Sequence, residues 1–243
     1  MKTKLPDAYL QLTLLCIIFL VINMVTVASL PIELSRIVRV STILFLLLFL
    51  AYHKGHTQLI VFLGILFFAL RDSLIIDYEN EFNKTFVFII TIFAYTLLAS
   101  IPLKKLKLSK STPVIIIFVI SLIALNVFNV YYLSDVVSSE LDTWFQLVLF
   151  FIQGAVLIIL GFVGFMYNER FEGKTPLIYL YFVLCFILSD LCGLAAYFFK
   201  FEAAYFPERA FYIIGLVLLV NFSLNQTIIQ EDRITERKKE YLL

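Results

Sequence analysis

Long apolar runs alternate with short polar segments along most of this 243-residue chain. Most runs are near the roughly 20 residues that a helix needs to cross the hydrocarbon core of a bilayer. Short polar segments such as residues 53–56 (HKGH) and 168–176 (NERFEGKTP) separate them. We therefore predict eight membrane-spanning helices over residues 8–28, 37–52, 57–76, 82–101, 114–133, 144–167, 177–199 and 207–229.

Composition favours the same class of protein. The chain is 62% hydrophobic and 15% charged, whereas a soluble domain is about half apolar and about a quarter charged. The polar segments are too short to form a soluble domain with its own core. We expect an all-α, polytopic membrane helical bundle that forms one integral domain over residues 1–243, with a short charged tail at 230–243.

Charge and cysteine content narrow the expected partners. The net charge of +1 gives no reason to expect nucleic acid, and the lipid bilayer is the partner that the composition indicates. Cys16, Cys185 and Cys192 all fall inside apolar runs and lack the spacing of a zinc site. With only His53 and His56 in one short turn, we expect no metal and no cofactor.

The basic residues predict an orientation. Of the 19 Lys and Arg residues, 13 fall in the termini and in the loops that eight spans place on the same side as the termini. The opposite side has five, namely Arg36, Arg39, Lys84, Lys200 and Arg209. The positive-inside rule then predicts a cell-membrane protein with both termini in the cytoplasm. Seven spans would place the basic tail and the basic loop 102–113 on opposite sides, which fits less well.

Two aspartates are the main candidates for chemistry. Asp72 and Asp190 each lie on the third predicted span of a four-span half and are 118 residues apart, which suggests a 4+4 internal repeat. An ionisable group in hydrocarbon is costly and is seldom kept without a function. Low dielectric disfavours the charged form, so two carboxyl groups in unequal surroundings can divide into an acid and a base. We expect a polar cavity shared by the two helices.

A structural role for Asp72 is the alternative, through pairing with a cation. Adjacent helical residues point about 100° apart, so we expect Arg71 to extend outward rather than to pair with Asp72. Arg36 and Arg39, three residues apart, are expected near the outer interface, where they bind a lipid phosphate or an aspartate, or simply anchor the helix. Tyr95 and Tyr212 are possible hydrogen-bond donors into the cavity.

Two segments resemble the YhhN (lysoplasmalogenase-like) family of eight-span membrane proteins. These are FILSDLCGLAAYFF (186–199), with the later Tyr212, and FALRDSLIIDYENEF (68–82). The resemblance implies hydrolysis of the vinyl-ether bond of a lysophospholipid-like substrate. It implies that Asp72 and Asp190 are catalytic and that the substrate is bound by Arg36, Arg39, Tyr95, Ser189 and Tyr212. The chain departs from the family pattern at Val40, Arg71, Ile92 and Gly215, where we expect proline, glycine, histidine and glutamine.

Two other classes of function stay open at this point. One is a non-enzymatic membrane sensor or receptor, in which the charged tail engages a partner. The other is a proton-coupled transporter that uses Asp72 and Asp190 as a relay. An enzyme requires the catalytic groups to reach one lipid-sized cavity, whereas a transporter requires a path that opens to each face in turn.

Overall fold

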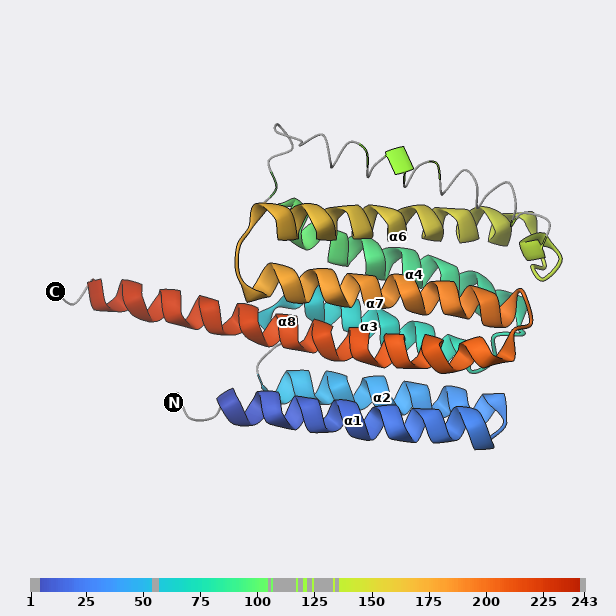
Figure 1. Ribbon diagram of the computed structural model, residues 1–243, viewed down its shortest axis with the longest axis horizontal. Helices are drawn as coiled ribbons and strands as arrows, with labels where there is room; N and C mark the ends of the chain where they lie inside the picture. The colour runs from blue at the N-terminus through green and yellow to red at the C-terminus, as the bar shows by residue number, and fades with distance from the viewer. Residues whose placement is uncertain are drawn as a thin grey trace.

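The computed structural model describes residues 5–53, 57–104 and 136–240, together with residues 106, 117, 120, 121, 124 and 133. In these residues the regular structure is helical and contains no strand. The elements are α1 (Leu5–Ser29), α2 (Ile32–Tyr52), α3 (Leu59–Ile75), α4 (Glu81–Leu103), α6 (Trp144–Arg170), α7 (Lys174–Tyr197), the 3-10 helix η3 (Glu202–Ala204) and α8 (Tyr205–Glu240). The long helices lie side by side along one axis, and α8 extends beyond the others (Figure 1).

Six of these helical segments are long and apolar enough to cross a membrane. They cover residues 8–29, 32–52, 81–103, 144–170, 174–197 and 202–227, which is compatible with a multi-pass membrane protein. The predicted span 57–76 corresponds to α3, whose 17 residues rise about 26 Å. The predicted span 114–133 lies largely outside the residues that the structure describes. The count of eight spans and the 4+4 repeat therefore stay predictions.

Local sequence sets several helix boundaries. The Asn80 side chain accepts hydrogen bonds from the backbone N–H groups of Phe82 (2.9 Å) and Asn83 (3.4 Å), so α4 begins with a typical N-cap. Helix α2 begins at Ile32, directly after Pro31, rather than at residue 37. The apolar run alone placed this start too late, because polar residues of the first turns, Ser35 and Arg36, are buried in the bundle. The predicted tail is helical as far as Glu240.

Aromatic side chains fill the middle of the bundle. Phe68 of α3 packs against Phe186 of α7 with 4.9 Å between ring centroids, and Tyr95 and Tyr212 contact the same pair of rings. Gly215 of α8 permits this packing, because a Cβ at that position would lie 2.9 Å from the ring of Phe186. Helices α7 and α8 therefore approach closely and hold the aromatic core in place.

The cations expected on the outer side lie mostly inside the bundle. Arg36, Arg39, Lys84 and Arg209 are only 4–9% exposed, and Lys200 is the exposed one. Each of the four buried cations forms an ion pair with a carboxylate. Helices α2, α4 and α8 begin at the end of the bundle where α3 and α7 finish (Figure 1). Buried charge is thus concentrated at one end of the molecule.

Candidate functional site

A cavity of about 1180 Å³ lies at this charged end and continues between α6 and α7. Apolar side chains form most of its wall, including Leu157, Ile158 and Ile187. The charged groups that line it are Arg36, Arg39, Arg71, Glu79, Asp190, Lys200, Glu202, Glu208 and Arg209. Its volume slightly exceeds the usual range of small-molecule sites, about 300–1,000 Å³. The site combines a charged region with a long apolar region.

Asp72 of α3 is fully enclosed by donors. Its Oδ2 accepts a 2.6 Å hydrogen bond from the Tyr212 hydroxyl of α8 and lies 3.1 Å from Nε of Arg39. Its Oδ1 accepts hydrogen bonds from Nε (3.1 Å) and Nη2 (2.9 Å) of Arg71. The Asp72 side chain has 0% exposure. It therefore holds the cationic side chains that line the cavity and is not itself part of the wall.

The expectation that Arg71 extends outward is wrong. Arg71 is 4% exposed and pairs with Asp72, its neighbour in sequence. The guanidinium lies 5.1 Å from the ring centroid of Phe68 and 4.8 Å from that of Tyr212. The long side chain folds back across these aromatic faces, where cation–π attraction adds to the ion pair. The 100° offset fixes the Cβ directions, but it does not limit where a flexible arginine ends.

Glu208 of α8 connects two more arginines. Its Oε1 accepts a 2.9 Å hydrogen bond from Arg39, and its Oε2 lies 3.5 Å from Nε of Arg209. Arg209 Nη1 also donates to Asn23 Oδ1 (3.3 Å) and to the Ser35 carbonyl (3.0 Å). From the sequence, Arg209 is expected only as one of five cations on the outer side, and Glu208 is not among the predicted site residues. The available signal was the spacing of Glu208 and Tyr212, which places them on one helical face.

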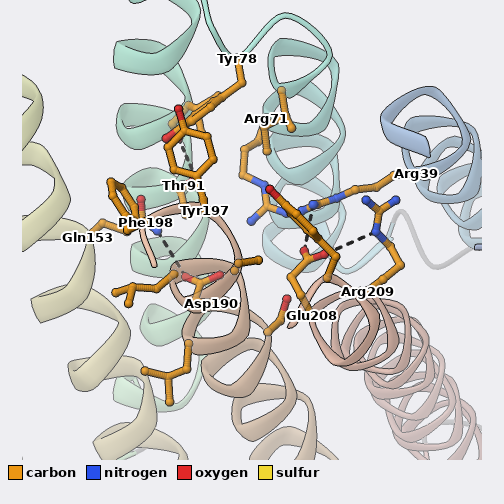
Figure 2. A pocket seen from close by; sticks show the side chains of 18 of the residues that line it. Arg39, Arg71, Tyr78, Thr91, Gln153, Asp190, Tyr197, Phe198, Glu208 and Arg209 are labelled. Carbon is orange, nitrogen blue, oxygen red and sulfur yellow. Dashed lines mark hydrogen bonds and ion pairs between the residues drawn. The ribbon is translucent and has the colours of Figure 1, made fainter. Parts of the chain in front are cut away.

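Arg39, Arg71 and Arg209 form an arginine cluster that contains more arginines than acids. These three arginines pair with two carboxylates, Asp72 and Glu208, so the formal charges of the five side chains sum to +1. In the described part of the chain, Arg71 Nη1 and Arg39 Nη2 have no hydrogen-bond partner. Guanidinium groups bind carboxylate and phosphate oxygens through such N–H groups. Figure 2 shows Arg39, Arg71 and Arg209 gathered on one side of the site.

Asp190 of α7 has a different environment. Its Oδ2 accepts hydrogen bonds from the Tyr95 hydroxyl of α4 (2.8 Å) and from Nε2 of Gln153 of α6 (3.3 Å). No Lys or Arg in the described ranges lies within ion-pair distance of it. Asp190 lines the cavity, as does the neighbouring Ser189. The two aspartates thus differ: Asp72 lies among cations, whereas Asp190 has neutral partners and faces the cavity.

The remaining predicted site residues divide between these environments. Tyr95 and Tyr212 are buried and do not line the cavity, but each donates to one aspartate. Arg36 lines the cavity and is held by Glu79 of the α3–α4 turn through two 2.9 Å hydrogen bonds. These hydrogen bonds from Arg36 lower the pKa of the Glu79 carboxyl. Arg36 is therefore committed to a neutral pair, while Arg39 belongs to the arginine cluster.

Other kinds of site find little support. Among the residues that the structure describes, no group of three or more His, Cys, Asp and Glu side chains is placed to hold a metal ion. Comparison of the chain with protein-family models, with curated proteins and with solved structures gave no match.

Proposed function

We propose that this protein is an integral membrane hydrolase of the lysoplasmalogenase type, which cleaves the vinyl-ether bond of a lysophospholipid-like substrate. The observation that carries the proposal is the position of Asp190, which has neutral partners and lines a mostly apolar cavity that four arginines also line. The resemblance of residues 68–82 and 186–199 to the YhhN family supports the same reaction. A substrate with one alkenyl chain and a phosphate matches both regions of the cavity.

Asp190 is suited to act first as an acid and then as a base. Tyr95 and Gln153 donate to Oδ2, which leaves Oδ1 to carry the proton. Transfer of this proton to the outer carbon of the vinyl ether gives an oxocarbenium ion and an Asp190 carboxylate. Water attacks the cationic carbon and gives a proton to that carboxylate, forming a hemiacetal. The hemiacetal then divides into an aldehyde and a glycerophospho-headgroup. A single carboxyl group thus gives one proton and takes one back over the reaction.

The arginine cluster is suited to hold the phosphate. Arg39, Arg71 and Arg209 line the cavity and keep N–H groups that their own acids do not use. Asp72 and Glu208 fix these guanidinium groups, so we assign them positioning roles and not contact with the substrate. The sequence-based prediction made Asp72 catalytic. In this proposal Asp72 instead positions the arginines that bind the headgroup. The alkenyl chain extends between α6 and α7.

The membrane arrangement belongs to the same proposal. We infer eight spans with both termini in the cytoplasm of a cell-membrane protein, because that arrangement follows the distribution of Lys and Arg. The charged end of the bundle then lies on the outer side, and the cavity takes its substrate from that half of the bilayer. Labelling of single cysteines introduced into the α3–α4 turn and into α8 beyond residue 230 tests this orientation in intact cells.

Aldehyde release from a lysoplasmalogen tests the activity. Purified protein in detergent is compared with Asp190→Asn, Asp72→Asn and the exposed-site control Asp77→Asn. We expect wild type and Asp77→Asn to release aldehyde at equal rates and Asp190→Asn to lose release entirely. We expect Asp72→Asn to lose substrate affinity and stability. Folded wild-type protein that releases no aldehyde, or full activity of Asp190→Asn, contradicts the proposal.

A lipid-binding sensor is the second candidate. The observation that favours it is the enclosure of Asp72, which leaves Asp190 as the accessible member of the predicted pair. Such a protein binds a lysophospholipid in the same cavity without consuming it. Binding of the lipid with no aldehyde release over hours selects this function in place of hydrolysis.

A further inference from the structure

Gln153 of α6 lies at the point where the cavity meets Asp190. It lines the cavity, and its Nε2 donates a 3.3 Å hydrogen bond to Asp190 Oδ2. The Tyr95 hydroxyl donates to the same oxygen, so this oxygen acts as an acceptor and the Gln153 atom that faces it is the amide nitrogen. The amide oxygen is thereby directed away from Asp190. Figure 2 shows Gln153 and Asp190 facing each other from adjacent helices.

The Oε1 atom of Gln153 is buried and has no hydrogen-bond partner among the residues that the structure describes. Buried amide oxygens are rarely left in this state, and such an atom calls for an explanation in the function or in a bound molecule. Elsewhere on α6, the Gln146 amide is fully used: Nε2 donates to the Glu81 carbonyl and to Thr85, and Oε1 accepts from the Asp142 backbone. The other buried side-chain atoms without a hydrogen-bond partner in the described residues are Ser35 Oγ and Arg39 Nε, and both residues line the same cavity.

The next residue of α6, Gly154, has no side chain at the cavity wall. Gly154 lines the cavity, and a Cβ built there meets no atom of the described residues within 4 Å. Most other helical glycines of the bundle, such as Gly161 and Gly215, have a close neighbour that explains the missing side chain. Packing against the described residues does not explain Gly154. An acceptor oxygen without a partner among the described residues, a carboxyl group and a residue without a side chain thus occur together at the cavity wall, on α6 and α7.

We propose that Gln153 Oε1 holds and orients the water molecule that captures the oxocarbenium ion. This inference rests on the proposed hydrolase function and adds a residue that contacts a reacting group. One O–H of the water donates to Gln153 Oε1. The other O–H points to the Asp190 carboxylate, which accepts that proton as the water oxygen bonds to the cationic carbon. Gln153 and Asp190 together fix the water, and the Nε2 hydrogen bond fixes the amide.

Competition between water and methanol tests this role directly. Water capture gives aldehyde, whereas methanol capture gives a mixed acetal that mass spectrometry detects. Wild type, Gln153→Leu, Gln153→Asn and the control Thr91→Val are compared in dilute methanol. Thr91 lines the same cavity, but its hydroxyl donates to the Val87 carbonyl within α4. Removing this hydroxyl therefore changes the polarity of the cavity wall without removing a contact to Asp190.

For Gln153→Leu we expect kcat to fall about tenfold or more with KM within about twofold, because binding precedes capture. We expect its acetal-to-aldehyde ratio to rise, and the ratio of Thr91→Val to match wild type. Gln153→Asn keeps the amide on a shorter side chain, so we expect its acetal-to-aldehyde ratio to lie between those of Gln153→Leu and wild type. This variant also shows whether the protein folds when position 153 keeps an amide. Active Gln153→Leu protein with an unchanged ratio and rate overturns this inference alone. Wild type that binds lipid but releases no aldehyde overturns the proposed function, and this inference with it.

Discussion

Arg71 and Asp72 are adjacent in sequence and form a buried ion pair, with Nη2 of Arg71 2.9 Å from Oδ1 of Asp72. Adjacent helical side chains do not normally face each other. Here the arginine reaches back across the aromatic rings of Phe68 and Tyr212. Because Asp72 also contacts Arg39, one carboxylate fixes two guanidinium groups at the wall of the cavity.

This relationship predicts that Asp72 is a major determinant of stability. Asp72→Asn leaves Arg39 and Arg71 without their shared carboxylate, and the loss of one partner from a buried ion pair typically costs about 3–5 kcal/mol. We expect a large decrease in the free energy of unfolding, measured by denaturant titration in detergent. Asp77→Asn in the exposed α3–α4 turn is the control and should change stability by less than about 0.5 kcal/mol. Equal stability of the two variants would refute the structural role of Asp72.

The sequence predicts the helical class and most helix positions because hydrophobic length carries that information. The expected runs at 82–101 and 144–167 correspond to α4 and α6. The start of α2 is less predictable, since Arg36 and Ser35 are polar and yet buried. A hydropathy pattern cannot distinguish a buried, paired arginine from one at the membrane surface, because the distinction depends on carboxylates in other helices.

The candidate site is likewise predictable from sequence only in part. Asp72 and Asp190 are identifiable from sequence, because a carboxylate within an apolar run is unusual. Their different environments are not identifiable from sequence. The two residues that donate to Asp190, Tyr95 and Gln153, lie 95 and 37 residues before it and on other helices. Glu208 lies 169 residues from its partner Arg39. Long-range pairings of this kind determine which aspartate is accessible, and no local spacing encodes them.

The hydrogen bond from Tyr95 to Asp190 predicts a specific effect on activity. Tyr95→Phe removes the 2.8 Å donor to Oδ2, so the carboxylate formed after proton transfer is less stabilised. We expect aldehyde release to fall about tenfold, since a hydrogen bond to a charged group contributes about 1.5–3 kcal/mol. Tyr179→Phe is the matched control, because Tyr179 is equally buried but donates to the Leu98 carbonyl. A loss of activity that is the same in both variants would indicate a general packing effect.

The two arginines of α2 should differ in ligand binding. Arg39 belongs to the cluster with excess positive charge, whereas Arg36 is held in a neutral pair by Glu79. We expect Arg39→Gln to weaken binding of a lysophospholipid about tenfold, and Arg36→Gln to change it less than about twofold. Isothermal titration in detergent micelles measures both dissociation constants. The reverse order of effects would place the headgroup at the α3–α4 turn.

The Arg36–Glu79 pair predicts how stability depends on pH. Hydrogen bonds from Arg36 lower the pKa of Glu79 below its ordinary value of 4.5, so the folded protein favours the carboxylate form. The contribution of the pair is therefore fully present above about pH 4.5 and is lost as pH falls through the lower pKa of the folded state. Because the Glu79 side chain is 63% exposed, we expect a contribution below about 1 kcal/mol.

Thermal unfolding of wild type and Glu79→Gln between pH 7 and pH 3 measures this contribution. We expect the wild type to have the higher unfolding temperature at pH 7, and the difference between the two proteins to shrink as pH falls below 4.5. Added salt should reduce the difference at pH 7, since the pair is partly solvated. A difference that stays constant down to pH 3 would mean that Glu79 contributes through packing of the turn and not through its charge.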